Sequence, residues 1–325
     1  MPIIQNQDYK PPFLFKNNHL NTITPAILRK VNSIKYTRFR IETNDNDFID
    51  FDRSSVNSST AVIVTHGLEG NSNKPYIKGI AKLMNENGFD AICANLRGCS
   101  NEHNQLLSSY HSGKTDDLAL LINHSVLQFK YKKIILIGFS LGGNITLKYI
   151  GEMGKMIPDY VKLAVTISVP CNLKSSAIQL IKKTNWIYLQ RFLRSLKKKA
   201  IFKMKKFGID DFKRNEILKT KNFFEFDNLF TAPIHGFENA EDYWSRCSCK
   251  QFLSSISIPT LIINAKDDPF LPDDCYPYFE AEKNPLLYLE IPKYGGHVGF
   301  MTSLFFKYPL WHEKRILSFI NEKLN

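Results

Sequence analysis

A serine between two glycines follows an apolar run in the segment KIILIGFSLGGN, residues 133–144. The apolar residues 134–137 suit a short strand that is buried on both faces. Gly138 and Gly142 stand two positions before and after Ser140, where they leave room for a tight backbone turn. A G-x-S-x-G pattern at the end of a strand is typical of a strained turn that holds a nucleophilic serine above a sheet. Taken alone, the pattern fits an ordinary glycine–serine turn equally well.

Two other segments carry the groups that a nucleophilic serine needs. A serine hydroxyl requires a base that takes its proton, and histidine, whose ordinary pKa is about 6.5, suits that role. His297 lies in the glycine-rich segment GGHVG after a strand-like run. Asp267 and Asp268 follow another strand-like run, and a carboxylate there would orient the imidazole. We favour Asp268, which stands four residues before Pro272 as in many hydrolase loops, and Asp267 stays open as the alternative.

Acyl transfer also requires N–H donors for the oxyanion of a tetrahedral intermediate. The backbone N–H of Leu141 follows the serine at an expected helix start. The loop His66-Gly67-Leu68 follows another expected strand, and Gly67 allows close approach of its backbone, so the N–H of Leu68 is the second expected donor. We expect His66 to brace this loop rather than to act as a base.

Strand-like and helix-like segments alternate along most of the chain. The strand-like segments are residues 33–40, 47–52, 60–65, 89–95, 134–137, 161–169, 259–264 and 286–291, the first two as an antiparallel pair. The helix-like segments are residues 75–87, 113–129, 142–152 and 311–323. This alternation predicts an α/β fold with a mostly parallel central sheet and helices on both faces. Ser140, Asp268 and His297 follow three of these strands in the chain order typical of α/β-hydrolases, so we expect the α/β-hydrolase fold.

One long segment interrupts the alternation. Residues 172–243 show no strand pattern and are predicted to form a helical cap, inserted between a first part of the core, residues 1–171, and a second part, residues 244–325. The aromatic residues of this segment suit contact with an acyl chain, and they suit packing of the cap onto the core equally well.

The net charge of +12 is concentrated in the same region of the chain. Residues 172–221 contain 15 Lys and Arg but 3 Asp and Glu, so the remainder is balanced. Two interpretations stay open: a solvated outer face on amphipathic helices, or weak contact with anionic substrates and surfaces. Because no zinc-finger or other nucleic-acid signature is present, a nucleic-acid partner is not expected.

Composition and short motifs restrict the remaining function classes. No apolar run approaches the about 20 residues of a membrane-spanning helix, and the N-terminal residues lack the features of a signal peptide. The six cysteines have no disulfide-framework spacing, which predicts a reducing, cytoplasmic setting. Neither a metal-ligand spacing nor a nucleotide fingerprint is present, so we expect no metal and no cofactor.

Several longer segments together resemble the YheT-like branch of the α/β-hydrolases, a group of carboxylester hydrolases. The resemblance covers nearly the whole chain, and it implies a catalytic triad of Ser140, Asp268 and His297. Members of the animal branch have an N-terminal membrane anchor that is not seen here, which favours a soluble, bacterial-type form. The matching segments are YKPPFLFKNNHLNTITP, HGLEGNSNKPY, NLRGCSNE, YHSGKTDDL, GFSLGGN, FDNLFTAPIHGF, NAKDDPFLP and GGHVGF.

The resulting hypothesis is a serine hydrolase that cleaves small carboxylic esters, acyl or lipid-like, through an acyl-enzyme intermediate. Two alternatives stay open: an alcohol or lysolipid acyltransferase with the same triad, and a non-catalytic binding protein on a hydrolase scaffold. His111 and Asp116 also fit the short H-x-x-x-x-D pattern of glycerolipid acyltransferases. Because this segment precedes an expected helix, we interpret Ser112, Thr115 and Asp116 as helix-capping residues.

Overall fold

The computed structural model describes residues 3–4, 8–32, 34–304 and 308–324. Within these residues the strands form one sheet in the order β1-β9-β8-β7-β6-β4-β5-β3-β2. β2 and β3 pair antiparallel, as do β3 and β5, and all other pairs are parallel. The strands are β1 (Ile3–Ile4), β2 (Thr37–Glu42), β3 (Phe48–Ser54), β4 (Thr60–Thr65), β5 (Asp90–Asn95), β6 (Lys133–Phe139), β7 (Val161–Ile167), β8 (Thr260–Ile263) and β9 (Leu287–Glu290).

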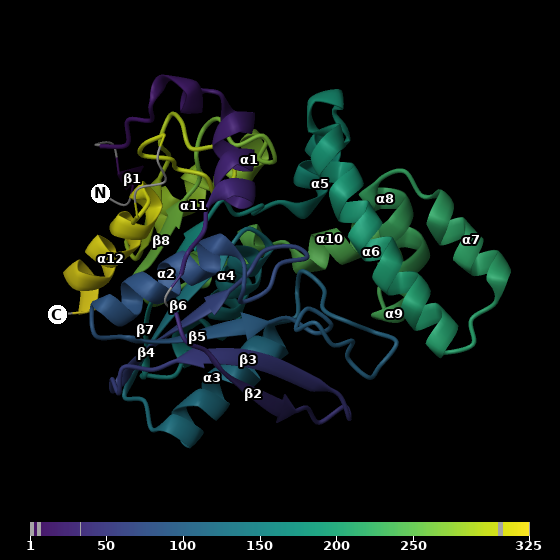
Figure 1. Ribbon diagram of the computed structural model, residues 1–325, viewed down its shortest axis with the longest axis horizontal. Coiled ribbons are helices and arrows are strands. Elements are labelled where there is room, and N and C mark those ends of the chain that lie inside the picture. The colour runs from purple at the N-terminus through teal and green to yellow at the C-terminus, as the bar shows by residue number, and fades with distance from the viewer. Residues whose placement is uncertain (1–2, 5–7, 33, 305–307, 325) are drawn as a thin grey trace.

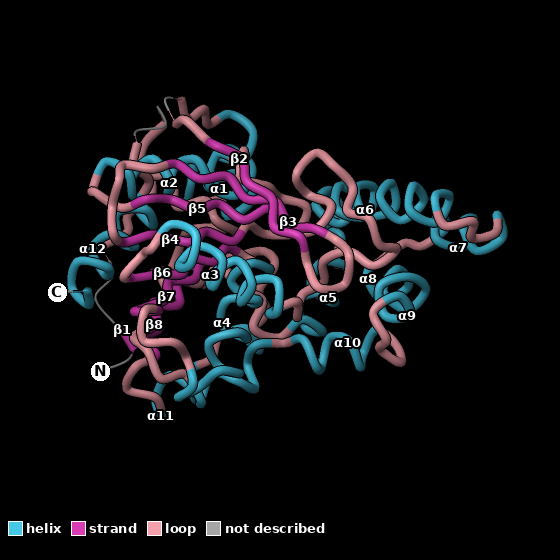
Figure 2. Tube along the Cα trace, turned by 90° about the horizontal axis from the view of Figure 1, so that it is seen from below, coloured by secondary structure: helices cyan, strands magenta, loops and turns pink. Residues whose placement is uncertain are grey.

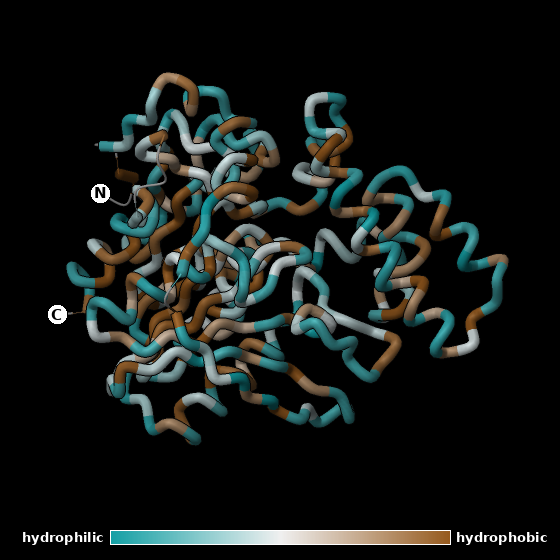
Figure 3. The backbone as a smooth tube through the Cα atoms, in the orientation of Figure 1, coloured by the Kyte–Doolittle hydropathy of each residue, from teal (hydrophilic) through white to brown (hydrophobic). Residues whose placement is uncertain are grey.

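The apolar run of β6 is explained by its place in the middle of the sheet. Ile134 and Leu136 belong to the apolar cluster on one face, whereas Ile135 and Ile137 belong to the cluster on the other. Successive side chains of a strand point to opposite faces, so a strand covered on both sides needs apolar residues at every position. Figure 3 shows apolar residues gathered along the central strands, whereas the inserted helices alternate between hydrophilic and hydrophobic.

Helices cover both faces of the sheet (Figures 1 and 2). α2 (Pro75–Glu86) and α12 (Trp311–Leu324) pack on one face, and α3 (Thr115–Phe129) and α4 (Leu141–Met153) pack on the other. α1 (Asn18–Leu28), which the sequence patterns did not predict, begins at an Asn17 cap whose side chain accepts a hydrogen bond from the Leu20 N–H. The expected α/β-hydrolase fold is therefore present, with a mostly parallel sheet and helices on both faces.

The residues predicted as a cap, 172–243, contain helices between β7 and β8, and in Figure 1 these helices extend to one side of the sheet. α5, α6 and α8 share an apolar cluster with Phe270 and Leu271, which lie in the loop after β8. The division into a core and a cap that act as separate units stays a prediction. The helices are α5 (Leu173–Ile181), α6 (Trp186–Lys206), α7 (Asp211–Lys219), α8 (Phe223–Phe226), α9 (Ala232–Ile234) and α10 (Ala240–Cys247).

Two lysines of the basic segment depart from the solvated outer face that the sequence suggested, although most of its cations are exposed. Lys203 is 2% exposed and donates to the Asn104 side chain and to the carbonyls of Leu106 and Ser108. Lys199 forms an ion pair with the buried Glu69 in the loop after β4, at 2.9 Å. Sequence spacing identifies an amphipathic helix, but contacts made on folding decide which of its lysines turn inward.

Two sequence expectations differ from the structure at the edges of the sheet. The strand expected at 33–40 begins at Thr37, and Ser33 lies outside the described residues. β1 was not predicted, because its two residues, paired with β9, are too few to show a periodic pattern. None of the described helices combines the length and the apolar character needed to cross a bilayer.

Candidate active site

Ser140 occupies a strained turn between β6 and α4. Its backbone has φ 53° and ψ −120°, a conformation that non-glycine residues rarely adopt. A Cβ on Gly138 would lie 2.6 Å from the Gly143 Cα, and a Cβ on Gly142 would lie 2.4 Å from the Thr65 carbonyl oxygen. Both contacts are too close for any side chain. The G-x-S-x-G spacing is therefore a steric requirement of this turn.

His297 connects the serine to an acid. Its Nε2 lies 3.0 Å from the Ser140 Oγ, and its Nδ1 lies 2.8 Å from Oδ2 and 3.1 Å from Oδ1 of Asp268. An ionised carboxylate only accepts hydrogen bonds, so Nδ1 carries the proton and Nε2 is free to accept from the serine hydroxyl. The Asp268 side chain is fully buried, which shields this pair from water. The structure thus brings together Ser140, His297 and Asp268.

The neighbouring Asp267 has different contacts. Its Oδ1 accepts the Gly296 N–H at 2.9 Å, and its carbonyl accepts from the Asn18 side chain at 2.8 Å. Its Oδ2 is buried and has no partner among the described residues. Burial raises the pKa of Asp267 to about 6, and the Gly296 N–H opposes that shift. Asp267 braces the histidine loop, whereas Asp268 contacts the imidazole.

The histidine loop packs against α1, the helix that sequence patterns did not predict. The His297 N–H donates to Thr22 Oγ1 at 2.9 Å. A Cβ on Gly299 would lie 2.1 Å from the Asn21 carbonyl oxygen, so the loop can approach α1 only with glycine at this position. The Phe270 ring, 4.1 Å from the imidazole between centroids, packs against the histidine. The asparagine cap of α1 was a signal for this helix, but no sequence signal pairs it with residue 297.

The loop after β4 lies against the nucleophile. A Cβ on Gly67 would be 3.1 Å from the Ser140 Cβ, so the backbone of this loop passes directly beside the serine. The Gly67 N–H donates to Tyr76 and the Glu69 N–H donates to Tyr110. Leu68 lies between these two anchored amides, and it lines the cavity beside Ser140. The N–H groups of Leu68 and Leu141 stay the predicted oxyanion donors.

His66 has the contacts of a structural residue. Its Nε2 accepts the Leu96 N–H at 3.1 Å, so Nδ1 carries the proton and donates to the Gly67 carbonyl at 2.7 Å. Complete burial lowers the pKa of His66 to about 4, so the ring is neutral near neutral pH. These bonds agree with the expectation that His66 braces the loop.

Two cavities meet at Ser140 and His297. The first, of about 140 Å³, extends beneath the inserted helices and has a mostly apolar lining. The second, of about 260 Å³, extends toward α1 and the N-terminal ends of α2 and α6. The apolar lining of the first cavity includes Leu173, Leu180, Phe223, Phe226, Phe230 and Leu271.

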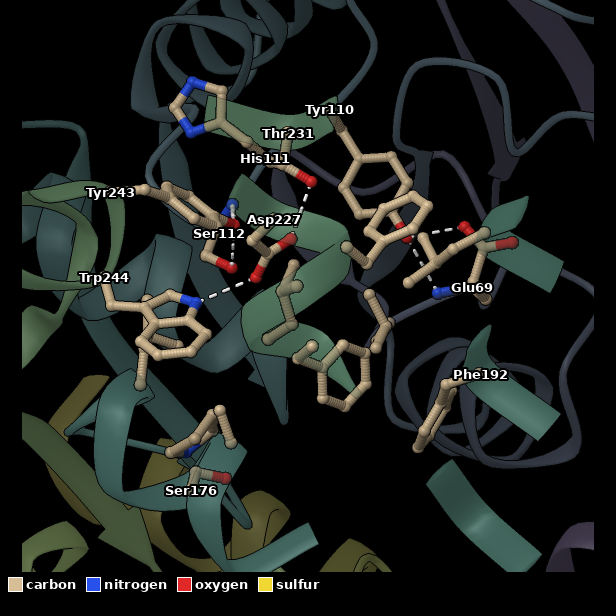
Figure 4. A pocket seen from close by; sticks show the side chains of 18 of the residues that line it. Glu69, Tyr110, His111, Ser112, Ser176, Phe192, Asp227, Thr231, Tyr243 and Trp244 are labelled. Atoms are coloured by element: carbon tan, nitrogen blue, oxygen red, sulfur yellow. Dashed lines mark hydrogen bonds between the residues drawn. The ribbon is translucent and has the colours of Figure 1, made fainter. Parts of the chain in front are cut away.

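Figure 4 shows polar groups at one side of the first cavity. Asp227 accepts hydrogen bonds from Trp244 Nε1 at 2.9 Å and from the Thr231 hydroxyl at 2.7 Å. Burial raises the pKa of Asp227 to about 6. Burial also lowers the pKa of His111 to about 2 and that of His235 to about 4, so both rings are neutral near neutral pH.

The capping interpretation of the segment 112–116 is wrong. The N-cap of α3 is Lys114, whose side chain makes no capping hydrogen bond. The Ser112 N–H and hydroxyl instead pair with Tyr243 of α10, at 2.9 and 2.7 Å, and Thr115 donates to Glu152 at 2.8 Å. Contacts with distant elements therefore replace the local caps that the sequence suggested.

Comparisons with known proteins place this geometry in a family. The model of the alpha/beta hydrolase fold matches residues 60–304. A protein of Escherichia coli (strain K12) named as an esterase, YheT, is 33% identical over 309 residues, which cover 93% of this chain and 89% of its own. The chain belongs to the α/β-hydrolase family. Within this family it is similar to the YheT branch, as its longer sequence segments indicated.

Other α/β-hydrolases extend the comparison. The mouse (Mus musculus) phospholipase ABHD3 is 28% identical over 312 residues, covering 93% of this chain and 75% of its own. A solved esterase of Pyrococcus furiosus, Pf2001, has a TM-score of 0.62 at 16% identity and covers 93% of this chain and 99% of its own. That structural likeness shows the shared fold. These relatives are named as esterases and a phospholipase.

Side chains of the types that bind metals do not cluster in the described part of the chain. Among the described residues, no group of three or more His, Cys, Asp and Glu side chains could hold a metal ion. The six cysteines of this α/β-hydrolase are buried and unpaired.

Proposed function

We propose that this α/β-hydrolase cleaves carboxylic esters by covalent catalysis with Ser140 as the nucleophile. The observation that carries the proposal is the continuous hydrogen-bond chain from Ser140 through His297 to Asp268, with distances of 3.0 and 2.8 Å. A serine within hydrogen-bond reach of a base that a third group orients is the arrangement that nucleophilic catalysis needs.

In the first half-reaction, the Ser140 Oγ attacks the ester carbonyl carbon while its proton passes to His297 Nε2. The buried Asp268 stabilises the imidazolium that forms. Backbone N–H groups of Leu68 and Leu141 stabilise the oxyanion. The bond from carbon to the alcohol oxygen then breaks, and His297 returns the proton to the departing alcohol. An acyl ester on Ser140 remains.

In the second half-reaction, His297 takes a proton from water, and the resulting hydroxide attacks the acyl carbon. Collapse of the second intermediate releases the carboxylic acid and returns the proton to Ser140. An alcohol in place of water would give a new ester by the same steps. The second cavity has room for such an acceptor beside the acyl-enzyme, so acyl transfer is the second candidate function.

The acyl part of the substrate occupies the first cavity in this proposal. Its apolar lining favours a hydrocarbon chain, because burial of each CH₂ group contributes about 0.8 kcal/mol. Its volume of about 140 Å³ favours short to medium chains over long ones.

The first test is labelling with a fluorophosphonate probe, beside turnover of p-nitrophenyl esters of increasing acyl length. We expect Ser140→Ala to abolish labelling and to reduce kcat by at least about 10⁴-fold. The exposed Ser254→Ala is the matched control and should behave as the unmodified protein. A folded but unlabelled natural protein would instead favour a binding function. Product analysis with added alcohol separates hydrolysis from transfer, since a transferase forms the new ester at low alcohol concentration.

A further inference from the structure

An ester has an acyl arm and an alcohol arm, and Ser140 stands where two cavities meet. Ser140, His297, Phe192 and Phe270 line both cavities. In the first cavity, Lys199 is paired with Glu69, and Lys203 is held by the Asn104 side chain and two carbonyl oxygens. The apolar walls beneath the inserted helices suit the acyl arm, which leaves the second cavity for the alcohol arm.

The second cavity carries an uncompensated positive charge. Its charged lining, apart from His297, consists of Arg29, Glu69, Lys74 and Arg191. Arg29 is buried in an ion pair with Glu313 at 2.8 Å, and Glu69 is paired with Lys199. Within the described part of the chain, neither Lys74 nor Arg191 has an acid within ion-pair distance. Two cations, the half-buried Lys74 and the exposed Arg191, therefore line this cavity without an acid at ion-pair distance.

The surroundings of Lys74 show that these cations affect each other. Burial lowers the pKa of its ammonium group, the charge of Arg191 lowers that pKa further, and the carboxylate of Glu69 opposes the shift. Lys74 is also the N-cap of the 12-residue α2, and Pro75 and Tyr76 of its first turn line the cavity. The positive end of the helix dipole adds to the potential of the two side chains. An anion placed here would relieve the repulsion that Lys74 experiences.

We propose that Lys74 and Arg191 bind a phosphate monoester group on the alcohol arm of the substrate. The inference rests on the proposed function, because it assigns the second cavity to the alcohol that leaves Ser140. A phosphate monoester carries about −1.5 to −2 charges at pH 7, which matches two cations better than the single charge of a carboxylate. Lys74 and Arg191 are thus residues that determine specificity, and the substrate class is an acylated alcohol phosphate.

The test compares two esters that differ only in this group, 1-decanoylglycerol and 1-decanoylglycerol 3-phosphate. We expect the natural protein to prefer the phosphorylated ester by at least about tenfold in kcat/KM. Lys74→Met and Arg191→Met should each lower kcat/KM for that ester about tenfold and leave the neutral ester within about twofold. Lys183→Met is the control, because Lys183 is exposed on the same inserted segment and lines neither cavity.

A binding measurement separates failure of this inference from failure of the proposed function. Ser140→Ala protein, which cannot form the acyl-enzyme, is titrated calorimetrically with glycerol 3-phosphate, glycerate and glycerol. We expect the phosphate to bind best, glycerate at least about fivefold more weakly, and Lys74→Met to weaken the phosphate alone. Equal binding of the three compounds, or equal loss of both esters in the Lys74 and Arg191 variants, would overturn the phosphate site. Absence of any Ser140-dependent ester turnover would overturn the proposed function, even if glycerol 3-phosphate binds.

Discussion

The adjacent carboxylates Asp267 and Asp268 make different hydrogen bonds and therefore have different roles in the candidate site. Asp268 accepts the His297 Nδ1–H, whereas Asp267 accepts a backbone N–H from Gly296. The first contact fixes the tautomer of the imidazole, and the second fixes the path of the loop that carries it. Only the first contact reaches the imidazole itself.

Asparagine substitutions should separate these roles. Asp268→Asn would place an amide opposite Nδ1 and favour the wrong tautomer, so we expect kcat to fall about 10⁴-fold. Asp267→Asn keeps an oxygen for the Gly296 N–H and removes a charge that is half-buried, so kcat should fall less than about tenfold. Steady-state kinetics on a p-nitrophenyl ester measures both. A larger loss for Asp267→Asn would make Asp267 the triad acid.

At the scale of elements, the histidine loop depends on α1, a helix distant from it in the chain. Thr22 accepts the His297 N–H, and its own hydroxyl donates to the Asn18 carbonyl at 2.7 Å. Gly296 and Gly299 allow the loop backbone to contact this helix. The position of the base above Ser140 is therefore set by packing between the two ends of the chain.

Thr22→Val should test this support. Valine has nearly the same shape but leaves the His297 N–H without its acceptor, which costs about 1–3 kcal/mol. We expect a lower Tm and a drop in kcat of about tenfold, because the base moves relative to Ser140. Thr24→Val on the same helix is the matched control. A lower Tm with unchanged kcat would mean that α1 supports the fold without positioning the histidine.

At the scale of the whole molecule, buried ionisable groups set the pH dependence of stability. Burial lowers the pKa of His66 to about 4, of His111 to about 2, of His235 to about 4 and of His312 to about 3. The unfolded chain takes up these protons near pH 6.5, so their neutral folded forms are stable above that pH and lose stability as the pH falls. Asp227 acts in the opposite direction, since its pKa is raised to about 6 and its ionisation destabilises the fold as the pH rises.

The histidines outweigh the aspartates Asp227 and Asp267, whose pKa values are both raised to about 6, between pH 7 and 5. The fully buried His66 and His312 together cost about 4 kcal/mol over this range, while protonation of the two aspartates recovers about 2 kcal/mol. We therefore expect urea unfolding to show a clear loss of stability at pH 5 relative to pH 7. Equal stability at the two pH values would contradict the neutral, buried state of these rings.

His312→Leu should reduce this dependence. Neither ring nitrogen of His312 has a partner among the described residues, so the substitution loses no hydrogen bond. We expect the difference in unfolding free energy between pH 7 and 5 to shrink by about 2 kcal/mol. His124→Leu is the control, because His124 is half-exposed and its pKa is lowered less severely by burial. Urea denaturation of both variants at the two pH values measures the effect.

The basic inserted segment determines where positive charge lies on the surface of the molecule. Lys199 and Lys203 turn inward, so contact with anionic surfaces stays a prediction that only its exposed cations could support. Neutralising Lys183 and Lys198 tests that contact without disturbing the buried pairs, by sedimentation with anionic lipid vesicles.

The serine turn and the order of the three catalytic candidates at strand ends could be predicted from the sequence. Gly138 is required by contacts within its own segment, so the G-x-S pattern predicts the turn from local sequence, whereas the contact that requires Gly142, with the Thr65 carbonyl, comes from the neighbouring strand β4. The bounds of β4 were predicted without error, because an apolar run at the centre of a parallel sheet depends on burial alone. The carboxyl ends of parallel strands share one edge of the sheet, and this placed Ser140, Asp268 and His297 in one site.

Features that depend on contacts between distant segments could not be predicted before the fold was known. The tertiary structure distinguished the partner of the imidazole from its neighbour, because two adjacent aspartates point in different directions that sequence does not record. It brought α1 under the histidine loop, a contact that spans 275 positions of the chain. It also paired Lys199 with Glu69 and left Lys74 and Arg191 facing a cavity, because the balance of charge in a site depends on which side chains meet after folding.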